Sequence, residues 1–244
     1  MNSLIIGASA GLGAALANQL AAEGHNLFLI ASDERDLSPI AKDLALRFGV
    51  VVKYLVVDLI AVDGVELRQK ILAEMENIEA LFYVAGYGNP PVDHGAVEAP
   101  LLKRLLGVNF TSGVTIINAF LDHLSSHPEA HLVGIGSVAT IRGRGTNVIY
   151  GAAKQGLEFY FSALRHAYQK TPMQTQFYRL GFMQTNLLGI NKTPIPAVSP
   201  KWAAAKIIKR LHKNSGAIYL PYWWGFIAMA LKLIPWFIFR RMSI

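Results

Sequence analysis

The chain has 244 residues, of which 52% are apolar and 16% are charged. This length suits one α/β domain, and this composition excludes an intrinsically disordered protein. The chain contains no cysteine, which excludes a disulfide scaffold, a Cys-ligated zinc site, an iron–sulfur cluster and thiol catalysis.

The net charge of +7 is unevenly distributed along the chain. Residues 1–158 contain 11 Lys/Arg and 16 Asp/Glu, whereas residues 159–244 contain 12 Lys/Arg and no acidic residue. Such asymmetry indicates an anionic partner for the C-terminal part, and nucleic acid and a membrane surface are the usual candidates. Nucleic acid is not expected, because the basic part carries no recognisable reading motif.

The N-terminal region enters a short apolar run with no basic segment before it, so we expect no secretory signal and a cytoplasmic protein. Further apolar runs follow, and each is continuous, as expected for a strand buried on both faces of a sheet. The seven runs span residues 3–6, 27–31, 50–57, 80–84, 131–136, 174–180 and 217–220. Segments with helical spacing, such as 12–23 and 37–48, lie between them. This alternation predicts an α/β fold: a single doubly wound Rossmann-type domain over residues 1–221, with about seven parallel strands and helices on both faces.

A glycine-rich turn follows the first run and precedes the first helical segment. Its glycines, Gly7, Gly11 and Gly13, have the spacing G-x-x-x-G-x-G. Such a turn lets backbone N–H groups approach a pyrophosphate, and the helix that follows adds a favourable dipole. No Gly-Lys-Ser/Thr follows, which excludes a P-loop. The turn therefore predicts a dinucleotide site. Asp58, at the end of the third run, is either an acceptor for an adenine amino group or a turn residue.

Three further polar residues are spaced as a proton-transfer site requires. Ser137 follows the fifth run, Tyr150 comes thirteen residues later, and Lys154 lies four residues beyond Tyr150. The i,i+4 spacing places phenol and ammonium on one helix face. A nearby ammonium favours the phenolate, and lowering a tyrosine pKa from about 10 by about three units needs roughly 4 kcal/mol. Ser137 can hold a substrate oxygen by a hydrogen bond. The three residues together predict a site in which a hydride converts a carbonyl to an alkoxide and the alkoxide then receives a proton.

Together, these features resemble the classical short-chain dehydrogenase/reductase family over residues 3–189. The resemblance also rests on the pair Ala85-Gly86 after the fourth run and on Asn109. It implies an enzyme that reduces a ketone to a secondary alcohol with NAD or NADP, with Asn109, Ser137, Tyr150 and Lys154 as catalytic residues. Ser137 and Tyr150 would also contact the substrate. The implied cofactor-binding residues are Gly7, Ser9, Ala10, Gly11, Leu12, Gly13, Ser32, Asp33, Arg35, Asp58, Leu59, Ala85, Gly86, Asn109, Tyr150, Lys154, Leu180, Gly181, Met183 and Thr185.

The same resemblance implies particular roles and shows three departures. Tyr150 would be the general acid/base, Lys154 would lower its pKa and bind the nicotinamide ribose, and Asn109 would hold the water of a proton relay. Ile6 stands where the family usually has threonine, Tyr83-Val84 replaces an Asn-Asn pair, and Leu180 replaces proline.

The residues after the second run bear on the choice of cofactor. Ala10 and Ser32 match neither the basic residues that select NADP nor the aspartate that selects NAD in this family. Asp33 would disfavour the 2′-phosphate of NADP, whereas Arg35 would attract it. We therefore expect a weak preference for NAD.

Two other groups of polar residues are candidate sites. Arg142 and Arg144 lie between the serine and the tyrosine, and they are either part of a solvated loop or a contact for a substrate phosphate. His123, His127 and His131 share a four-residue spacing, but Pro128 interrupts the helix, so no metal site is expected.

The C-terminal segment, residues 222–244, differs in kind from the rest. Residues 222–239 are apolar or small apart from Lys232; Pro235 interrupts them, and Arg240 and Arg241 follow. A spanning helix needs about 20 uninterrupted apolar residues, so the segment does not suit a membrane span. Its aromatic and basic flanks are typical of an interfacial helix on an anionic membrane. A lid over the substrate pocket and an oligomer contact are the alternatives, and we expect a homo-oligomer.

A narrower resemblance concerns the substrate. The motif Tyr150-Gly-x-x-Lys154-x-Gly-Leu157, the arginine loop and the ending Ile234-Pro235-x-x-Ile238-Phe239-Arg240-Arg241 are similar to reductases of decaprenylphosphoryl 2-keto-ribose. This implies a hydrophobic or lipid-linked ketone reduced on the cytoplasmic face of a membrane. A soluble reductase of small ketones or acyl carriers is the second hypothesis. A non-catalytic nucleotide sensor is the third, and the intact serine, tyrosine and lysine argue against it.

Overall fold

The computed structural model describes residues 1–88, 94–185, 195–213 and 215–242. In this part of the chain, seven parallel strands form one sheet in the order β3-β2-β1-β4-β5-β6-β7. The strands are β1 (Asn2–Ile6), β2 (Asn26–Ala31), β3 (Val52–Val56), β4 (Ala80–Tyr83), β5 (His131–Ser137), β6 (Gln174–Leu180) and β7 (Ala217–Leu220). Each predicted run forms a strand, and the order reverses beside β1, as in a doubly wound sheet.

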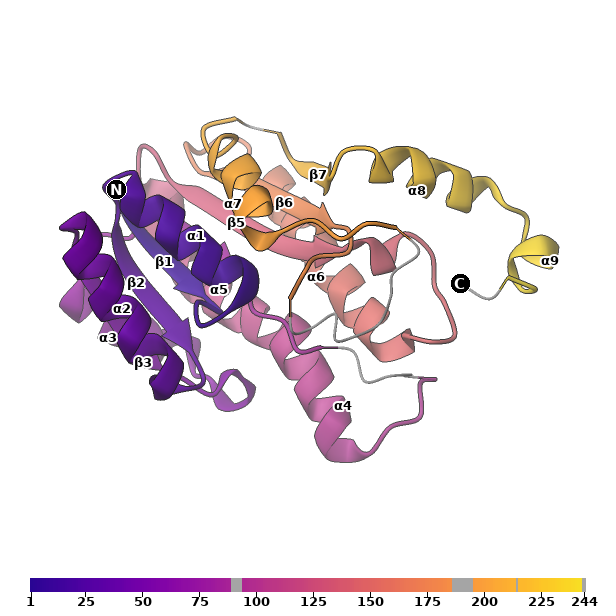
Figure 1. Ribbon diagram of the computed structural model, residues 1–244, viewed down its shortest axis with the longest axis horizontal. Coiled ribbons are helices and arrows are strands. Elements are labelled where there is room, and N and C mark those ends of the chain that lie inside the picture. Colours follow the sequence, from indigo (N-terminus) through magenta and orange to yellow (C-terminus); the bar gives the residue numbers. More distant parts are fainter. Residues whose placement is uncertain (89–93, 186–194, 214, 243–244) are drawn as a thin grey trace.

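Helices cover both faces of the sheet (Figure 1). They are α1 (Gly11–Ala22), α2 (Glu34–Phe48), α3 (Gly64–Glu74), α4 (Ala99–Leu106), α5 (Ser112–Ser126), α6 (Val148–Ala167), α7 (Pro200–Ile208), α8 (Trp224–Leu233) and α9 (Trp236–Phe239). Short turns of helix also occur at η1 (Leu59–Ala61), η2 (Gly107–Thr111) and η3 (Val138–Thr140). The predicted fold class is confirmed.

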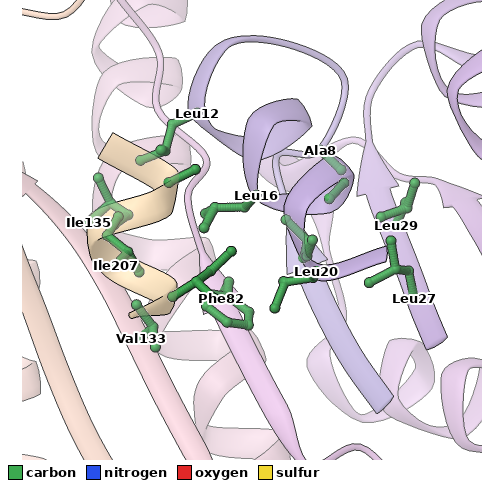
Figure 2. Packing of buried hydrophobic residues seen from close by; sticks show 14 of the residues in the cluster. Ala8, Leu12, Leu16, Leu20, Leu27, Leu29, Phe82, Val133, Ile135 and Ile207 are labelled. Atoms are coloured by element: carbon green, nitrogen blue, oxygen red, sulfur yellow. The ribbon is translucent and has the colours of Figure 1, made fainter. Parts of the chain in front are cut away.

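Successive residues of each strand point to opposite faces, so the sheet has two cores. On one face Ile5 packs with α1, α2 and α7; on the other, Leu4 and Ile6 pack with α3, α5 and α6. Figure 2 shows the first core, where the leucines of α1 contact side chains of β4 and β5. This burial on both faces explains why the strands are continuous apolar runs rather than alternating ones.

The helical stretch Ala99–Ser126, which runs from α4 through η2 to α5, is the one helix of the described residues that is long and apolar enough to cross a membrane. In its most apolar window, 44% of the residues are buried inside the protein. Ile116, Ile117 and Phe120 belong to the second core. The stretch therefore has the character of a core helix.

After β7, the chain leaves the sheet and forms α8 and α9, which extend from this edge of the molecule (Figure 1). Trp224 and Ala228 of α8 are buried in a third, smaller cluster with Ile141, which follows η3. The C-terminal segment is thus packed against the loop that follows β5.

Candidate active site

The glycine turn lies at the carboxyl end of β1, where its backbone is closely packed. Gly7 has φ +97°, and a Cβ atom there would lie 2.7 Å from the Cα atom of Ala85. A Cβ atom at Gly13 would overlap the carbonyl oxygen of Gly7. Gly11 has φ +54°, and its Cβ would lie 3.1 Å from Cγ2 of Thr185. The turn therefore requires glycine at these positions, and Thr185 lies beside it.

The first turn of α1 is open to an anion. Its N-cap residue, Ala10, makes no side-chain capping bond, and the first turn contains no acidic residue. By contrast, Asp33 caps α2 and Asp63 caps α3. Uncapped N–H groups at a helix N-terminus, next to a glycine turn, suit the diphosphate of a dinucleotide. The residues present therefore fit the cofactor that the sequence predicts.

The residues predicted to lie near the adenosine are in place at the ends of β2 and β3, but they bond to their own neighbours. The Asp33 carboxylate accepts hydrogen bonds from the Arg35 side chain at 3.0 Å and 2.5 Å. These bonds lower the pKa of Asp33 to about 2 and raise that of Arg35. Asp58 accepts from the Ile60 N–H at 3.0 Å and caps η1. A contact of these residues with adenosine stays a prediction.

Ser137 and Tyr150 meet at the carboxyl end of the sheet. Ser137 is the last residue of β5, and its hydroxyl accepts from the Ala139 N–H at 3.1 Å. Tyr150 lies in the first turn of α6, and its hydroxyl is hydrogen-bonded to Ser137. A carbonyl oxygen placed between these two hydroxyls would receive a hydrogen bond from each.

Lys154 lies one turn further along α6 and is buried. Its Nζ is 3.4 Å from the carbonyl oxygens of Ala85 and Ile135. A Cβ atom at Gly86 would lie 3.5 Å from this Nζ and 3.6 Å from Oδ1 of Asn109. Lysine, asparagine and the Ala85-Gly86 pair therefore converge. Burial lowers the pKa of Lys154 to about 8, which leaves the ammonium mainly charged at neutral pH.

Asn109 is fully buried in η2, a π-helical turn between α4 and α5. Its Nδ2 donates to the carbonyl oxygens of Leu105 and Tyr87, at 3.0 Å and 3.2 Å, and its Oδ1 accepts from the Tyr87 N–H at 3.2 Å. These bonds fix the side chain with its oxygen near Lys154. A π turn adds one residue within a helix and is frequent at functional sites.

The pKa of Tyr150 differs from expectation. Burial raises this pKa, and the hydrogen bond from Ser137 opposes the rise. The net shift is upward because the cost of burying a phenolate outweighs the hydrogen bond from Ser137, and the lowering by Lys154 that the resemblance implies stays a prediction. A neutral phenol is nevertheless the form that can give a proton to an alkoxide, so the site is suited to carbonyl reduction.

The residues after β6 contact the C-terminal segment. A Cβ atom at Gly181 would overlap Nε1 of Trp224, so this tryptophan lies directly on the glycine. The Trp224 ring also packs against Phe182 and Trp223, with centroids 5.7 Å and 5.2 Å apart. Met183 makes an isolated bridge to Val198. Helix α8 thus forms an apolar wall next to Gly181, one of the cofactor-binding residues that the resemblance implies.

Arg142 contacts the end of α8, and its role as a phosphate contact stays a prediction. Its Nη1 donates to the carbonyl oxygens of Leu231, at 2.8 Å, and Ile234. Its guanidinium carbon lies 3.9 Å from the centre of the Phe239 ring. The reason is that the last carbonyls of a helix have no partner in the helix, and those of α8 face this arginine.

Arg144 stays a candidate substrate contact. It is half-buried, and burial alone lowers its pKa, with no carboxylate of the described residues contributing. An anionic group of a substrate would supply the missing partner.

Glu158, the last acidic residue of the chain, is used inside the fold. Its carboxylate accepts from Arg179 at 2.8 Å and 2.5 Å and from the Thr140 hydroxyl at 3.2 Å. The Arg179 guanidinium also lies 4.8 Å from the centre of the Tyr219 ring. This network joins α6, β6, β7 and η3 beneath the candidate active site. No sequence motif indicates this network, because its partners lie far apart along the chain.

Comparison with known proteins agrees with this geometry. The family model for short chain dehydrogenases matches residues 2–193. The chain belongs to the short-chain dehydrogenase/reductase family: it is an NAD(P)-dependent oxidoreductase that acts on CH–OH groups and reduces carbonyls.

Individual relatives are distant. An uncharacterized oxidoreductase of Mycobacterium tuberculosis is 25% identical over 98% of this chain and 96% of its own. The bulky-bulky ketone specific alcohol dehydrogenase from Comamonas testosteroni has a similar structure, with a TM-score of 0.81, 22% identity and coverage of 96% and 95%. L-sorbose reductase from Gluconobacter frateurii, solved with NADPH and L-sorbose, has a TM-score of 0.79, 19% identity and coverage of 89% and 94%.

These comparisons bear on two finer predictions. The sorbose reductase was solved with NADPH, so the predicted preference for NAD gains no support. The cofactor is therefore given as NAD(P). None of these three proteins is described as a reductase of decaprenylphosphoryl 2-keto-ribose, so that narrower resemblance stays a hypothesis.

Proposed function

We propose that this enzyme reduces a bulky, hydrophobic ketone that carries an anionic group, and that a polyprenyl-phosphate keto-sugar is the narrower candidate. The observation that carries the proposal is the apolar wall of α8. Trp224 and Ala228 pack beside Ile141, four residues after Ser137, and Phe182 completes the wall after β6. A substrate carbonyl at Ser137 would have its larger substituent against this surface.

The proton chemistry follows from the positions of the side chains. A bound reduced nicotinamide would supply the hydride that the carbonyl carbon takes up. The carbonyl oxygen then accepts the phenolic proton of Tyr150, while Ser137 donates a hydrogen bond to the same oxygen. The buried ammonium of Lys154 stabilises the phenolate that this transfer leaves behind.

The printed names of two similar proteins support a large substrate, whereas the sorbose reductase was solved with a small sugar. The Comamonas enzyme is named for bulky-bulky ketones, and a relative from Mycosarcoma maydis, 23% identical over 90% of this chain, is named a very-long-chain 3-oxoacyl-CoA reductase. A small soluble ketone would leave the aromatic surface of α8 without a role in binding.

Replacing Tyr150 with phenylalanine tests the assignment. We expect Tyr150→Phe to lower kcat at least a hundredfold, the lower end of what a general acid contributes, while binding of NADPH or NADH stays unchanged in fluorescence titrations. Turnover would be measured with a bulky aromatic ketone, a polyprenyl-phosphate keto-pentose and a small ketone.

Tyr168→Phe, at the end of the same helix, is the matched control and should retain full activity. Substantial residual turnover in Tyr150→Phe would overturn the catalytic assignment. Efficient reduction of the small ketone alone would instead overturn the substrate proposal.

A further inference from the structure

The C-terminal helices have an exposed apolar face in addition to the buried one. Tyr222, Phe226, Met229 and Leu233 are 77%, 66%, 59% and 75% exposed. The spacing of three and four residues places Phe226, Met229 and Leu233 in one stripe along α8, and Tyr222 lies in the turn just before this helix. Trp236 and Phe237 of α9, which follows in the chain, are also exposed. We call these six residues the outer ridge.

The inner face of α8 is already covered, so the outer ridge is not needed to hold the helix in place. Trp224 and Ala228 are buried in the third cluster. Arg142 binds the last carbonyls of α8 and lies over the Phe239 ring. Soluble proteins rarely expose a contiguous apolar patch of this kind unless it binds something.

The charges around the outer ridge indicate what that partner is. Lys232, Arg240 and Arg241 are exposed beside it. The chain has no acidic residue after Glu158, and that carboxylate is taken up by Arg179. An apolar stripe with aromatic side chains and flanking cations fits the interface of an anionic bilayer.

Other partners fit this surface less well. In a symmetric dimer through the outer ridge, each copy would bring the same cations to the contact, and like charges would repel. Nucleic acid would match the charge but not the apolar stripe. A spanning segment is excluded by size, because ten residues of α8 extend over about 15 Å and the hydrocarbon core is about 30 Å thick.

We propose that the outer ridge lies flat in the interface of a membrane rich in anionic lipids and holds the enzyme on its surface. An open groove of about 380 Å³ between Tyr219 of β7 and α8 adjoins Met229 and Leu233, with Lys232 at its rim. A lipid chain can lie in this groove with its phosphate beside the lysine. Docking on the membrane would bring the active site to lipid-linked ketones. The biological purpose of docking therefore rests on the proposed function.

The test is flotation of the full-length protein on vesicles of phosphatidylcholine, with and without phosphatidylglycerol, at low and high salt. The wild type should float only with the anionic vesicles and less at high salt. The variant Phe226→Ser/Leu233→Ser should bind at least tenfold more weakly. Neutralising Lys232, Arg240 and Arg241 with glutamine should weaken binding about fivefold per charge, since each is worth ~1 kcal/mol.

The matched control is Leu46→Ser/Val65→Ser, which replaces two equally exposed apolar residues on α2 and α3 and should float like the wild type. Reduction of a water-soluble bulky ketone without vesicles should be the same in all four proteins. The activity assay separates membrane docking from the proposed ketone reduction, because flotation does not require turnover.

Wild type that fails to float, or a ridge variant that floats normally, would overturn membrane docking. A wild-type dimer that the ridge substitutions dissociate would assign the surface to a second copy.

Discussion

His131 illustrates how a single buried side chain can make stability depend on pH. It lies in β5 with 1% of its surface exposed, and neither ring nitrogen has a hydrogen-bond partner among the described residues. Its ring packs edge-on against His212, with centroids 4.9 Å apart. Burial, and then the neighbouring His212 and His25, lower the pKa of His131 from 6.5 to about 4.

We expect acid to destabilise the protein through this residue. Above pH 6.5 both the folded and unfolded states hold a neutral His131. Between pH 6.5 and about 4 only the unfolded state takes up the proton, so stability falls by roughly 1.4 kcal/mol per pH unit. Urea unfolding near pH 7 and near pH 5 measures the loss, and His131→Phe should reduce it by about 2 kcal/mol. The control His166→Gln, at an exposed position of α6, should leave the loss unchanged. An identical loss in His131→Phe would contradict the assignment.

A second prediction concerns Arg144 and the charge of the substrate. We expect Arg144→Gln to raise KM for a phosphorylated ketone about tenfold, because one charge-assisted contact with a partner contributes on the order of 1.5 kcal/mol. The KM for a neutral bulky ketone should not change. Steady-state kinetics with both substrates decides the matter, and equal effects on the two would show that Arg144 has only a structural role.

At the level of elements, Arg142 connects the loop after β5 to the end of α8. Its bonds to the carbonyls of Leu231 and Ile234 hold the C-terminal segment against the catalytic domain. We expect Arg142→Gln to loosen this segment and to speed tryptic cleavage at Lys232 and Arg240 severalfold. Limited proteolysis followed by mass spectrometry gives the sites and rates. Arg47→Gln, which breaks an exposed ion pair on α2, is the control and should be cleaved there like the wild type.

The elements also show what the sequence can predict. The seven strands lie within two residues of their expected bounds, because a strand buried on both faces is necessarily a continuous apolar run. The candidate catalytic residues Tyr150 and Lys154 could be predicted together because their spacing is local, and both lie on α6. Glu158 and Arg179, and Arg142 and Leu231, were missed because their contacts join distant segments.

Helix α8 was only partly predictable for a further reason. Residues on both of its faces are apolar, so periodicity cannot show which face packs and which is exposed. The π turn that holds Asn109 has no sequence signal either, since it depends on the junction of α4 and α5. The pKa of Tyr150 could not be derived from spacing, because it depends on burial.

For the whole molecule, cofactor binding and folding stability should be coupled. A ligand that binds only the folded protein stabilises it by about 2.7 kcal/mol at 100 times its Kd. For a chain of 244 residues this corresponds to a rise in Tm of roughly 5–10 °C. Thermal unfolding with matched concentrations of NADH and NADPH would therefore rank the two cofactors.

Gly13→Ala should abolish this rise in Tm, because the added methyl group would overlap the Gly7 carbonyl and distort the turn. Gly143→Ala, where a Cβ meets nothing within 4 Å, should keep it. A normal rise in Gly13→Ala would mean that the cofactor binds elsewhere.

The strand order has a consequence for how the chain folds. β1 pairs with β2 on one side and with β4 on the other, so the centre of the sheet cannot close until residue 83 has been synthesised. Every neighbouring pair is parallel, and its two strands are far apart along the chain, which makes folding slow compared with that of helical proteins of equal size. β4 pairs with β5, which is synthesised nearly fifty residues later. Until then one edge of this apolar strand is unpaired and can pair with a wrong strand. A chaperone that shields nascent chains should therefore raise the yield of this protein most when translation is slowed between β4 and β5.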